Sequence, residues 1–257
     1  MKTLTIIKIG GNIIDKPEEL DLFLEEFAKI DGPRILIHGG GVMASEMSER
    51  LGIKTQMHQG RRITDLETLK LVSMVYAGWI NKSIVAKLQK IGCNSIGLSG
   101  ADADCVPAVR RSPVPVDFGY VGDVDPMQIN TGFLLSLLGK GITPVFCAIT
   151  HDRNGSILNT NADTMASSLA IAMSGEYYTK LIYCFEKQGV LSNTVDEESV
   201  IPLITASSYK SLKEKGVIKE GMIPKMDNAF YAIDNGVSEV YIKHASNLGN
   251  DKGTVLK

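Results

Sequence analysis

The sequence is poor in aromatic residues, in cysteine and in net charge. Aromatic residues make up 6% of the 257 residues, with a single Trp, and the four cysteines include no CxxC pair. Cysteines without that spacing fit neither a disulfide framework nor a zinc site. We therefore predict that all four are reduced packing residues of a cytoplasmic protein: Cys93, Cys105, Cys147 and Cys184.

Neither a nucleic acid nor a membrane is the expected partner. The formal net charge of −2 argues against the basic surface that binds phosphate backbones or anionic lipid, so any cationic site must be local. No apolar run approaches the roughly 20 residues of a membrane span. The first predicted strand begins at Leu4, so we expect no signal peptide before it. The four histidines lack metal-ligand spacing, and we expect no metal held by the protein.

Short apolar segments alternate with longer helical patterns. The strand candidates are runs of Ile, Leu and Val without strict alternation, which is typical of parallel strands buried on both faces: Leu4–Ile9, Ile35–His38, Ser95–Leu98, Thr143–Ile149, Lys180–Phe185 and Glu239–Lys243. The helix candidates are Pro17–Ile30, Ala44–Leu51, Asp65–Ile91, Met127–Leu138, Asp163–Met173, Thr205–Lys215 and Lys225–Asn235. This alternation predicts an α/β fold, a three-layer αβα open sandwich with a mainly parallel central sheet.

Three segments stand out from the alternation. Ile53–Ile63 and Val106–Val124 are rich in Gly, Pro, Arg and β-forming residues, and we predict inserted β-hairpins there. The helix Asp65–Ile91 is unusually long and carries an apolar stripe that includes Leu66 and Trp79. Such a stripe fits a subunit interface or a core helix, and the sequence leaves both open.

Two glycine clusters end the first two predicted strands. Lys8-Ile9-Gly10-Gly11 ends the first, and His38-Gly39-Gly40-Gly41 ends the second. Glycine lets backbone N–H groups approach an anion, and a helix start adds partial positive charge. The spacing matches neither GxxxxGK[ST] nor GxGxxG. A phosphate site is therefore one interpretation, and ordinary strand-to-helix turns are the other.

Three short polar side chains surround a predicted helix start: Asn159, Asn161 and Asp163. Such residues cap helices by accepting hydrogen bonds from orphan N–H groups. A cap needs only one of them, which leaves two without a structural role.

Two basic residues complete the candidate set. Arg62 lies in the first predicted hairpin. Its guanidinium is suited to bind a carboxylate through two hydrogen bonds, and the alternative is an exposed hairpin arginine. Lys225 opens a predicted helix, where a positive charge is unfavourable, so we expect a negative group beside it.

The order of these motifs resembles that of the N-acetylglutamate kinases, which belong to the amino-acid kinase superfamily. The similarity runs from Ile6 to about Gly253 and rests on these motifs: Lys8-x-Gly10-Gly11, His38-Gly39-Gly40-Gly41, Gly60-Arg61-Arg62-Ile63-Thr64, Asp117-x-Gly119-x-Val121-Gly122-x-Val124, Asn159-x-Asn161-Ala162-Asp163 and Gly221-Met222-Ile223-Pro224-Lys225. The resemblance implies transfer of the γ-phosphoryl group of ATP to the γ-carboxylate of an N-acyl-L-glutamate in arginine biosynthesis. It also implies an N-terminal lobe, residues 1–174, for the acyl-glutamate and dimerisation, and a C-terminal lobe, residues 175–257, for ATP.

The resemblance also implies roles for individual residues. Lys8 and Lys225 would flank the moving phosphoryl group, Asp163 would hold both lysines, and Gly11 would offer a backbone N–H, with Gly10 as a further N–H donor. The acyl-glutamate would contact Gly40, Gly41, Arg62, Asn159 and Asn161, with Arg62 on its α-carboxylate. ATP would contact Gly10, Glu186, Gly189 and Lys219, and Mg²⁺ would be held mainly by the nucleotide phosphates and water.

Other features depart from the family pattern. Glu186 stands in Phe185-Glu186-Lys187-Gln188-Gly189, where the family has a Thr-Asp-Val-like turn, and no extra N-terminal helix precedes the first strand. We therefore expect a homodimer without feedback inhibition by arginine. Arg61, Arg110 and Arg111 are unexpected: we predict solvated surface charges, with a larger acidic acyl group such as succinyl as the alternative. Another superfamily kinase (glutamate 5-kinase, carbamate kinase or uridylate kinase) and a non-catalytic sensing module are the competing functions.

Overall fold

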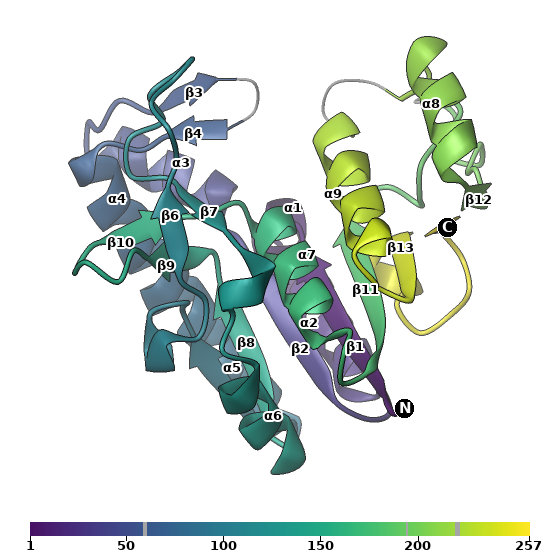
Figure 1. Ribbon diagram of the computed structural model, residues 1–257, viewed down its shortest axis with the longest axis horizontal. Helices are drawn as coiled ribbons and strands as arrows, with labels where there is room; N and C mark the ends of the chain where they lie inside the picture. Colours follow the sequence, from purple (N-terminus) through teal and green to yellow (C-terminus); the bar gives the residue numbers. More distant parts are fainter. Residues whose placement is uncertain (59–60, 194, 219–221) are drawn as a thin grey trace.

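A computed structural model describes residues 1–58, 61–193, 195–218 and 222–257. A central sheet of eight strands has the order β12-β14-β13-β11-β1-β2-β8-β5, with helices on both of its faces (Figure 1). The strands are β1 (Thr3–Ile9), β2 (Arg34–His38), β5 (Ser95–Leu98), β8 (Thr143–Cys147), β11 (Tyr178–Phe185), β12 (Leu203–Ile204), β13 (Glu239–His244) and β14 (Thr254–Leu256). All neighbouring pairs are parallel except β13–β14, which is antiparallel. The predicted fold class is confirmed.

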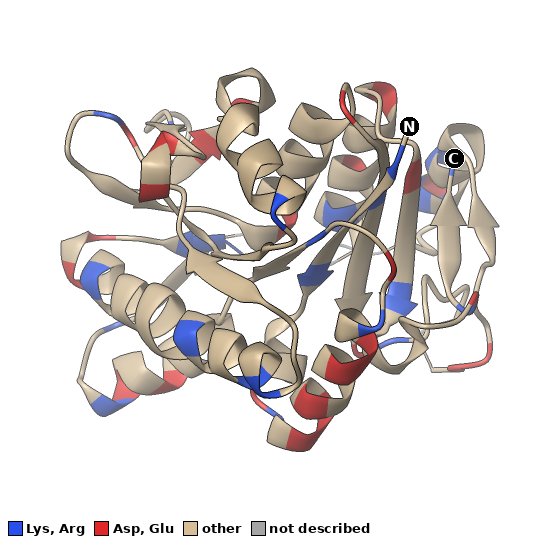
Figure 2. Ribbon diagram, turned by 90° about the horizontal axis from the view of Figure 1, so that it is seen from below, with Lys and Arg blue, Asp and Glu red and all other residues tan. Residues whose placement is uncertain are grey.

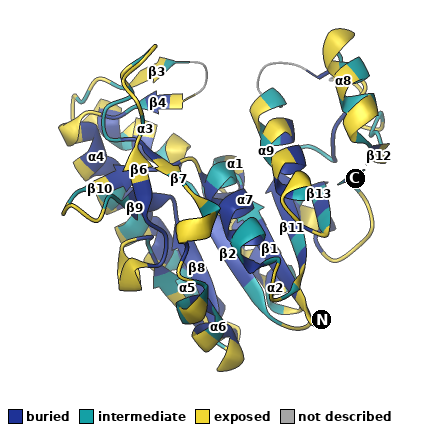
Figure 3. Cartoon of the chain, in the orientation of Figure 1, coloured by how far each residue is buried: buried dark blue, intermediate teal, exposed yellow. Residues whose placement is uncertain are grey.

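The sheet is buried because its central strands are apolar on both faces. In β1, Leu4, Ile6, Ile7 and Ile9 have no exposed surface, and Figure 3 shows buried strands beneath helices that are exposed on their outer side. Helices α6 (Thr131–Gly139), α7 (Ala162–Met173) and α9 (Ile223–Asp234) cover one face, and α2 (Pro17–Ala28) and α5 (Asn81–Lys90) cover the other. In the described part of the chain, no helix is long and apolar enough to span a membrane.

The two predicted hairpins are present, and a third one was not predicted. Antiparallel pairs form between β3 (Gln56–His58) and β4 (Arg61–Ile63), and between β6 (Ala108–Arg110) and β7 (Gly122–Val124). The single strand expected over Thr143–Ile149 is wrong, because the sheet strand β8 ends at Cys147. The chain then leaves the sheet and pairs β9 (Ile149–His151) with β10 (Ile157–Asn159). A continuous apolar run conceals this break. The short strands β12 and β14, the last two at one end of the sheet, were also missed.

The long predicted helix is continuous but changes its winding. It consists of α4 (Leu66–Ser73), a π-helical segment (Met74–Ile80) and α5. A π turn rotates the residues that follow it relative to α-helical spacing. Leu66 and Trp79 of the predicted apolar stripe are 48% and 67% exposed in this chain. The core-helix alternative is therefore wrong at these two positions, and the subunit-interface alternative stays a prediction.

Other helix boundaries also differ from the predictions. The helix expected from Met127 begins later, because Pro126–Gln128 form a 3₁₀ turn and the Asn130 side chain caps α6. Helix α3 (Gly41–Arg50) begins directly at the glycine cluster instead of at Ala44, and α8 (Ala206–Glu214) lies beside α9 in the C-terminal region (Figure 1). The sheet continues across residue 174, since β1 pairs with β11, and the division into two lobes stays a prediction.

The close approach of α3 to the π-helical segment predicts that Gly40 cannot accept a side chain. Its φ is +153°, and a Cβ there would lie 2.3 Å from Ile80 Cδ1 and 2.9 Å from Tyr76 Cδ1. We expect Gly40→Ala to lower the free energy of unfolding by about 2–4 kcal/mol, through backbone strain and overpacking. Urea denaturation measures this.

Gly41→Ala is the matched control, because no atom lies within 4 Å of the Cβ it would add. Its stability should stay within about 0.5 kcal/mol of the wild type. Equal effects of the two substitutions would show that the predicted crowding around Gly40 is absent.

Candidate active site

The glycine clusters meet at one edge of the sheet. Parallel strands all end at the same edge, so the residues that follow β1 and β2 lie close together. Gly11 is the first residue of α1 (Gly11–Ile14) and Gly41 the first of α3. First-turn N–H groups have no acceptor in their own helix and are suited to bind an anion. The two clusters therefore bring two helix starts to this edge.

Asp163 joins two lysines that are distant in the sequence. Its Oδ1 lies 2.9 Å from Lys8 Nζ in an ion pair, and its Oδ2 accepts a hydrogen bond of 2.8 Å from Lys225 Nζ. The three side chains are only 12–17% exposed. The contacts implied by the resemblance are confirmed, and Lys225 has the negative partner that its position at a helix start requires.

Aromatic rings fix the position of Lys225. Tyr183 of β11 lies beside Lys8 of β1 in the parallel register, and the Tyr183 hydroxyl donates to the backbone carbonyl of Asp163 at 3.2 Å. Lys225 Nζ lies 5.1 Å from the centre of the Tyr183 ring and 5.9 Å from that of Phe185. Cation–π attraction at these distances favours the charged ammonium.

The charges of the cluster alter one another's protonation. Burial raises the pKa of Asp163, but the two adjacent ammonium groups outweigh it and hold this pKa well below its usual range. Burial lowers the pKa of Lys225, Lys8 lowers it further, and Asp163 opposes both. Asp163 is therefore ionised at neutral pH, and it offsets part of the repulsion between the lysines.

The polar residues around the start of α7 have different roles. The Asn161 side chain caps the helix by accepting from the backbone N–H groups of Asp163 and Thr164 at 2.9 and 3.0 Å. Asn159 donates from Nδ2 to Thr64 Oγ1 at 3.0 Å. Capping thus explains Asn161, while Asp163 faces the lysines.

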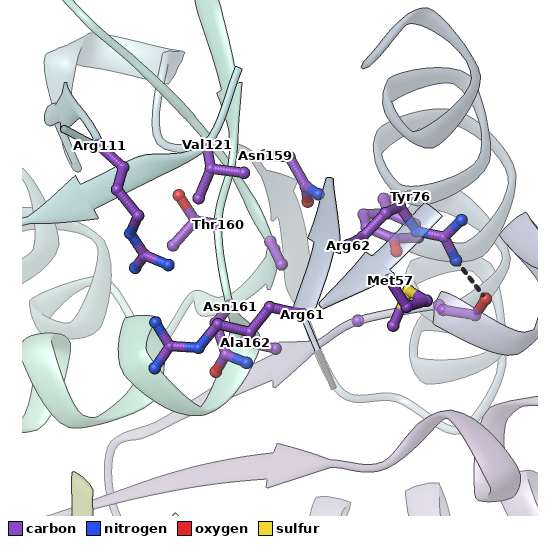
Figure 4. A pocket seen from close by; sticks show the side chains of 14 residues that line it. Met57, Arg61, Arg62, Tyr76, Arg111, Val121, Asn159, Thr160, Asn161 and Ala162 are labelled. Carbon is purple, nitrogen blue, oxygen red and sulfur yellow. Dashed lines mark hydrogen bonds between the residues drawn. The ribbon is translucent and has the colours of Figure 1, made fainter. Parts of the chain in front are cut away.

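A pocket of about 200 Å³ lies between the second glycine cluster and the start of α7. It is lined by Gly39, Gly40, Gly41, Met57, Arg61, Arg62, Tyr76, Arg111, Val121, Ala148, Asn159, Thr160, Asn161 and Ala162 (Figure 4). All five residues expected to contact the acyl-glutamate line it. Lys8, Asp163 and Lys225 are not among the lining residues, but the lining residue Ala162 directly precedes Asp163 in α7.

Arg62 is held rigidly at one end of this pocket. It is 9% exposed, and its Nη2 donates to the Gly41 carbonyl at 3.1 Å and to Ser45 Oγ at 2.8 Å. Its Nη1 donates to Thr55 Oγ1 at 3.2 Å. Sequence reasoning missed the supporting residues Ser45 and Thr55, because no motif marks them. It also missed Tyr183, which looks like an ordinary strand residue.

The residues expected to contact ATP are placed differently. Gly10 donates its N–H to the Cys184 carbonyl at 3.0 Å, so the expectation that this N–H could serve a phosphate is wrong: the sheet uses it. Glu186 is exposed just after β11. At Gly189 an added Cβ would lie 2.8 Å from Thr254 Oγ1, so this glycine is needed for packing. Lys219 lies outside the described residues.

The histidines and cysteines outside the site are structural. His38 is buried, with Nδ1 2.8 Å from the Gly39 carbonyl and Nε2 3.0 Å from Asn81 Nδ2, as its predicted hydrogen-bonding role requires. All four cysteines are buried and free. Among the described residues, no group of three His, Cys, Asp or Glu side chains could hold a metal ion.

Lysines and arginines are spread over several elements instead of one face (Figure 2). The αβα sandwich and the paired lysines thus define an α/β protein with a local cationic site for anionic reactants. Comparison with known proteins agrees: residues 3–244 match the amino acid kinase family. The chain belongs to this family.

Curated relatives cover nearly the whole chain. The chain is 54% identical to the acetylglutamate kinase of Cytophaga hutchinsonii over 96% of this chain and 94% of that protein. It is 50% identical to the acetylglutamate kinase of Phocaeicola vulgatus, with 99% and 98% covered. The solved structure of smu.665 from Streptococcus mutans superposes with a TM-score of 0.80 at 26% identity, covering 99% of this chain and 98% of the other.

The bridge between the lysines predicts a pH-dependent stability. We expect Asp163→Asn to lower the free energy of unfolding by about 2–4 kcal/mol at pH 7, because two buried ammonium groups lose their counter-ion. The pKa of Asp163 is depressed in the folded state, so its contribution is present above the unfolded pKa of about 3.9. It is lost as the pH falls toward the folded pKa. Urea denaturation at pH 7 and pH 3 should therefore show a smaller difference at pH 3.

Asp21→Asn is the control, because Asp21 forms an exposed ion pair with Lys87. Such a pair contributes at most about 1 kcal/mol. If Asp163→Asn is as stable as the wild type at pH 7, the bridge does not stabilise the fold.

Proposed function

We propose that this protein phosphorylates the γ-carboxylate of N-acetyl-L-glutamate with ATP, forming an acyl phosphate in arginine biosynthesis. The observation that carries the proposal is the Asp163 carboxylate between Lys8 and Lys225, beside a pocket with a fixed arginine. Relatives that share about half of its residues over the whole chain carry the name acetylglutamate kinase.

The reaction needs charge neutralisation more than proton transfer. A glutamate side chain has a pKa near 4.3, so the attacking carboxylate is already ionised at neutral pH and needs no general base. The obstacle is the approach of this anion to the anionic γ-phosphate. Lys8 and Lys225 offset the repulsion and stabilise the negative charge on the transferring and leaving oxygens. Asp163 keeps both ammonium groups in position.

The pocket residues orient the acyl-glutamate. Arg62 binds its α-carboxylate, since a guanidinium matches a carboxylate in a two-bond geometry. Asn159, Asn161 and the backbone around Gly40 and Gly41 fix the amide end. The N–H of Gly11 contacts the reacting oxygens. Positioning of this kind lowers the activation barrier, because the entropy of bringing the reactants together is already lost on binding.

The nucleotide binds on the C-terminal side, residues 175–257, near Glu186, Gly189 and Lys219. Mg²⁺ accompanies it and neutralises phosphate charge when bound. The described residues offer no cage for this ion, and both oxygens of Asp163 already contact lysines. Phosphate oxygens and water therefore supply most of its ligands.

The enzyme acts as a cytoplasmic homodimer without arginine feedback. Free buried cysteines suit a reducing compartment. Met74 and Trp79 are 63% and 67% exposed on the π-helical segment, where a second copy of the chain could cover them. Trp79→Glu should convert the dimer to a monomer in sedimentation velocity, because it would bury a charge. A wild-type monomer, or a variant that stays dimeric, would contradict this interface.

Two competing functions have less support. A sensing module would be free to lose one of the charged residues, yet Lys8, Lys225 and Asp163 are all present and in contact. Another superfamily kinase has less support because the relatives that share about half of the residues over nearly the whole chain carry the name acetylglutamate kinase.

Lys8→Met and Lys225→Met test the proposed chemistry. Each should lower kcat with N-acetyl-L-glutamate and ATP by at least about a hundredfold, because one source of transition-state charge stabilisation is lost. A coupled assay of ADP release measures this. Lys70→Met is the control, since Lys70 is an exposed residue paired with Glu67. A Lys8→Met or Lys225→Met variant that retains most of the wild-type kcat would refute the proposed role.

A further inference from the structure

The pocket contains more positive charge than N-acetyl-L-glutamate requires. That substrate has two carboxylates: the γ-carboxylate meets the lysines, and the α-carboxylate meets Arg62. Two further arginines, Arg61 and Arg111, line the same pocket. Under the proposed function, N-acetyl-L-glutamate offers neither of them an anion to bind.

Arg61 and Arg111 lie at the opposite end of the pocket from Arg62. Arg61 begins β4, and Arg111 directly follows β6, so the two come from different hairpins. Figure 4 shows their guanidinium groups on the same side, whereas the Arg62 guanidinium points the other way toward α3. The pocket thus has two separate cationic ends.

This second end of the pocket has more positive than negative charge. Arg111 forms an ion pair with Asp123, with its Nε 3.0 and 3.1 Å from the two carboxylate oxygens. Arg61 has no ion-pair partner among the described residues. The partial loss of solvent around its guanidinium lowers the pKa of Arg61, and the nearby charge of Arg111 lowers it further, although Asp123 opposes this. Two arginines held close together with one carboxylate leave a net positive charge.

The neighbouring Arg110 differs from Arg61 and Arg111 because its side chain lies outside the pocket. Its Nε donates to the Gly119 carbonyl at 2.8 Å, and its guanidinium lies 4.7 Å from the centre of the Tyr120 ring. It does not line the pocket. The prediction of a surface charge thus holds for Arg110, while Arg61 and Arg111 line the pocket.

We propose that Arg61 and Arg111 form a carboxylate subsite, and that the preferred substrate is an N-acyl-L-glutamate whose acyl group ends in a carboxylate, as N-succinyl-L-glutamate does. This rests on the proposed function, since it concerns the acyl group of the same substrate. The planar guanidinium groups match a carboxylate. The phosphoryl transfer is unchanged: a γ-carboxylate oxygen forms a bond to the γ-phosphorus, and the bond from that phosphorus to ADP breaks.

A nucleotide phosphate is a poorer fit for this subsite. The hairpins β3–β4 and β6–β7 lie at one end of the molecule, and α9, β11 and β13 lie toward the other end (Figure 1). The lysines that would meet the phosphates come from β1 and α9, on the other side of the start of α7. The hairpin end therefore faces the far end of the acyl-glutamate.

The test compares kcat and KM for N-acetyl- and N-succinyl-L-glutamate, with ATP and Mg²⁺, in the full-length protein. We expect the wild type to favour the succinyl substrate in kcat/KM by about tenfold or more, which is the effect of a hydrogen bond to a charged group. Arg61→Gln should remove most of this preference by raising KM for the succinyl substrate, with a much smaller loss on the acetyl substrate. Arg61 is exposed, so the substitution should preserve the fold.

Arg110→Gln is the matched control and should keep the wild-type preference. A wild type that prefers the acetyl substrate overturns the subsite but leaves the proposed reaction intact. An Arg61→Gln variant whose kcat/KM falls equally for both substrates also overturns the subsite and leaves the proposed reaction intact. If neither acyl-glutamate is phosphorylated, the proposed function itself fails, and the subsite with it.

Discussion

The contact of one carboxylate with two ammonium groups holds the site together. Asp163 lies at the start of α7, Lys8 in the central strand β1 and Lys225 in the first turn of α9, so the bridge joins three elements. Without Asp163 the two lysines would repel each other in a poorly solvated place. One ionic contact thus ties the start of α7 to β1 and α9 and holds the two ammonium groups close together.

The arginine side of the pocket follows a different principle. Arg62 is buried and anchored by three oxygen acceptors, so its position is fixed before any ligand arrives. At the hairpin end, Arg61 is exposed and Arg111 is paired with Asp123. Under the proposed function, the anchored Arg62 would bind the α-carboxylate that all N-acyl-glutamates share, and Arg61 and Arg111 would distinguish one acyl group from another.

The backbone conformation at Gly40 and in the π-helical segment determines the shape of one pocket wall. Gly40 has a positive φ and packs against Tyr76 and Ile80, so the pocket wall depends on the π-helical segment that presents those residues. The same segment turns Trp79 outward. One irregular stretch of helix therefore shapes the pocket and the exposed surface together.

The sequence by itself determined the alternation of strands and helices, because burial on both faces of a parallel sheet demands apolar runs between amphipathic segments. It also determined the glycine turns after β1 and β2, and that Lys225 needs an anion, because these depend on local backbone and dipole properties. The family resemblance carried by the motifs also pointed to Asp163 as that anion. Only the tertiary structure decided that Ser45 and Thr55 anchor Arg62, and that Arg61 and Arg111 line one pocket while Arg110 does not. It also decided that the Gly10 N–H belongs to the sheet and that the run after β8 leaves it. These outcomes depend on which residues are brought together from distant parts of the chain, and no local pattern encodes that.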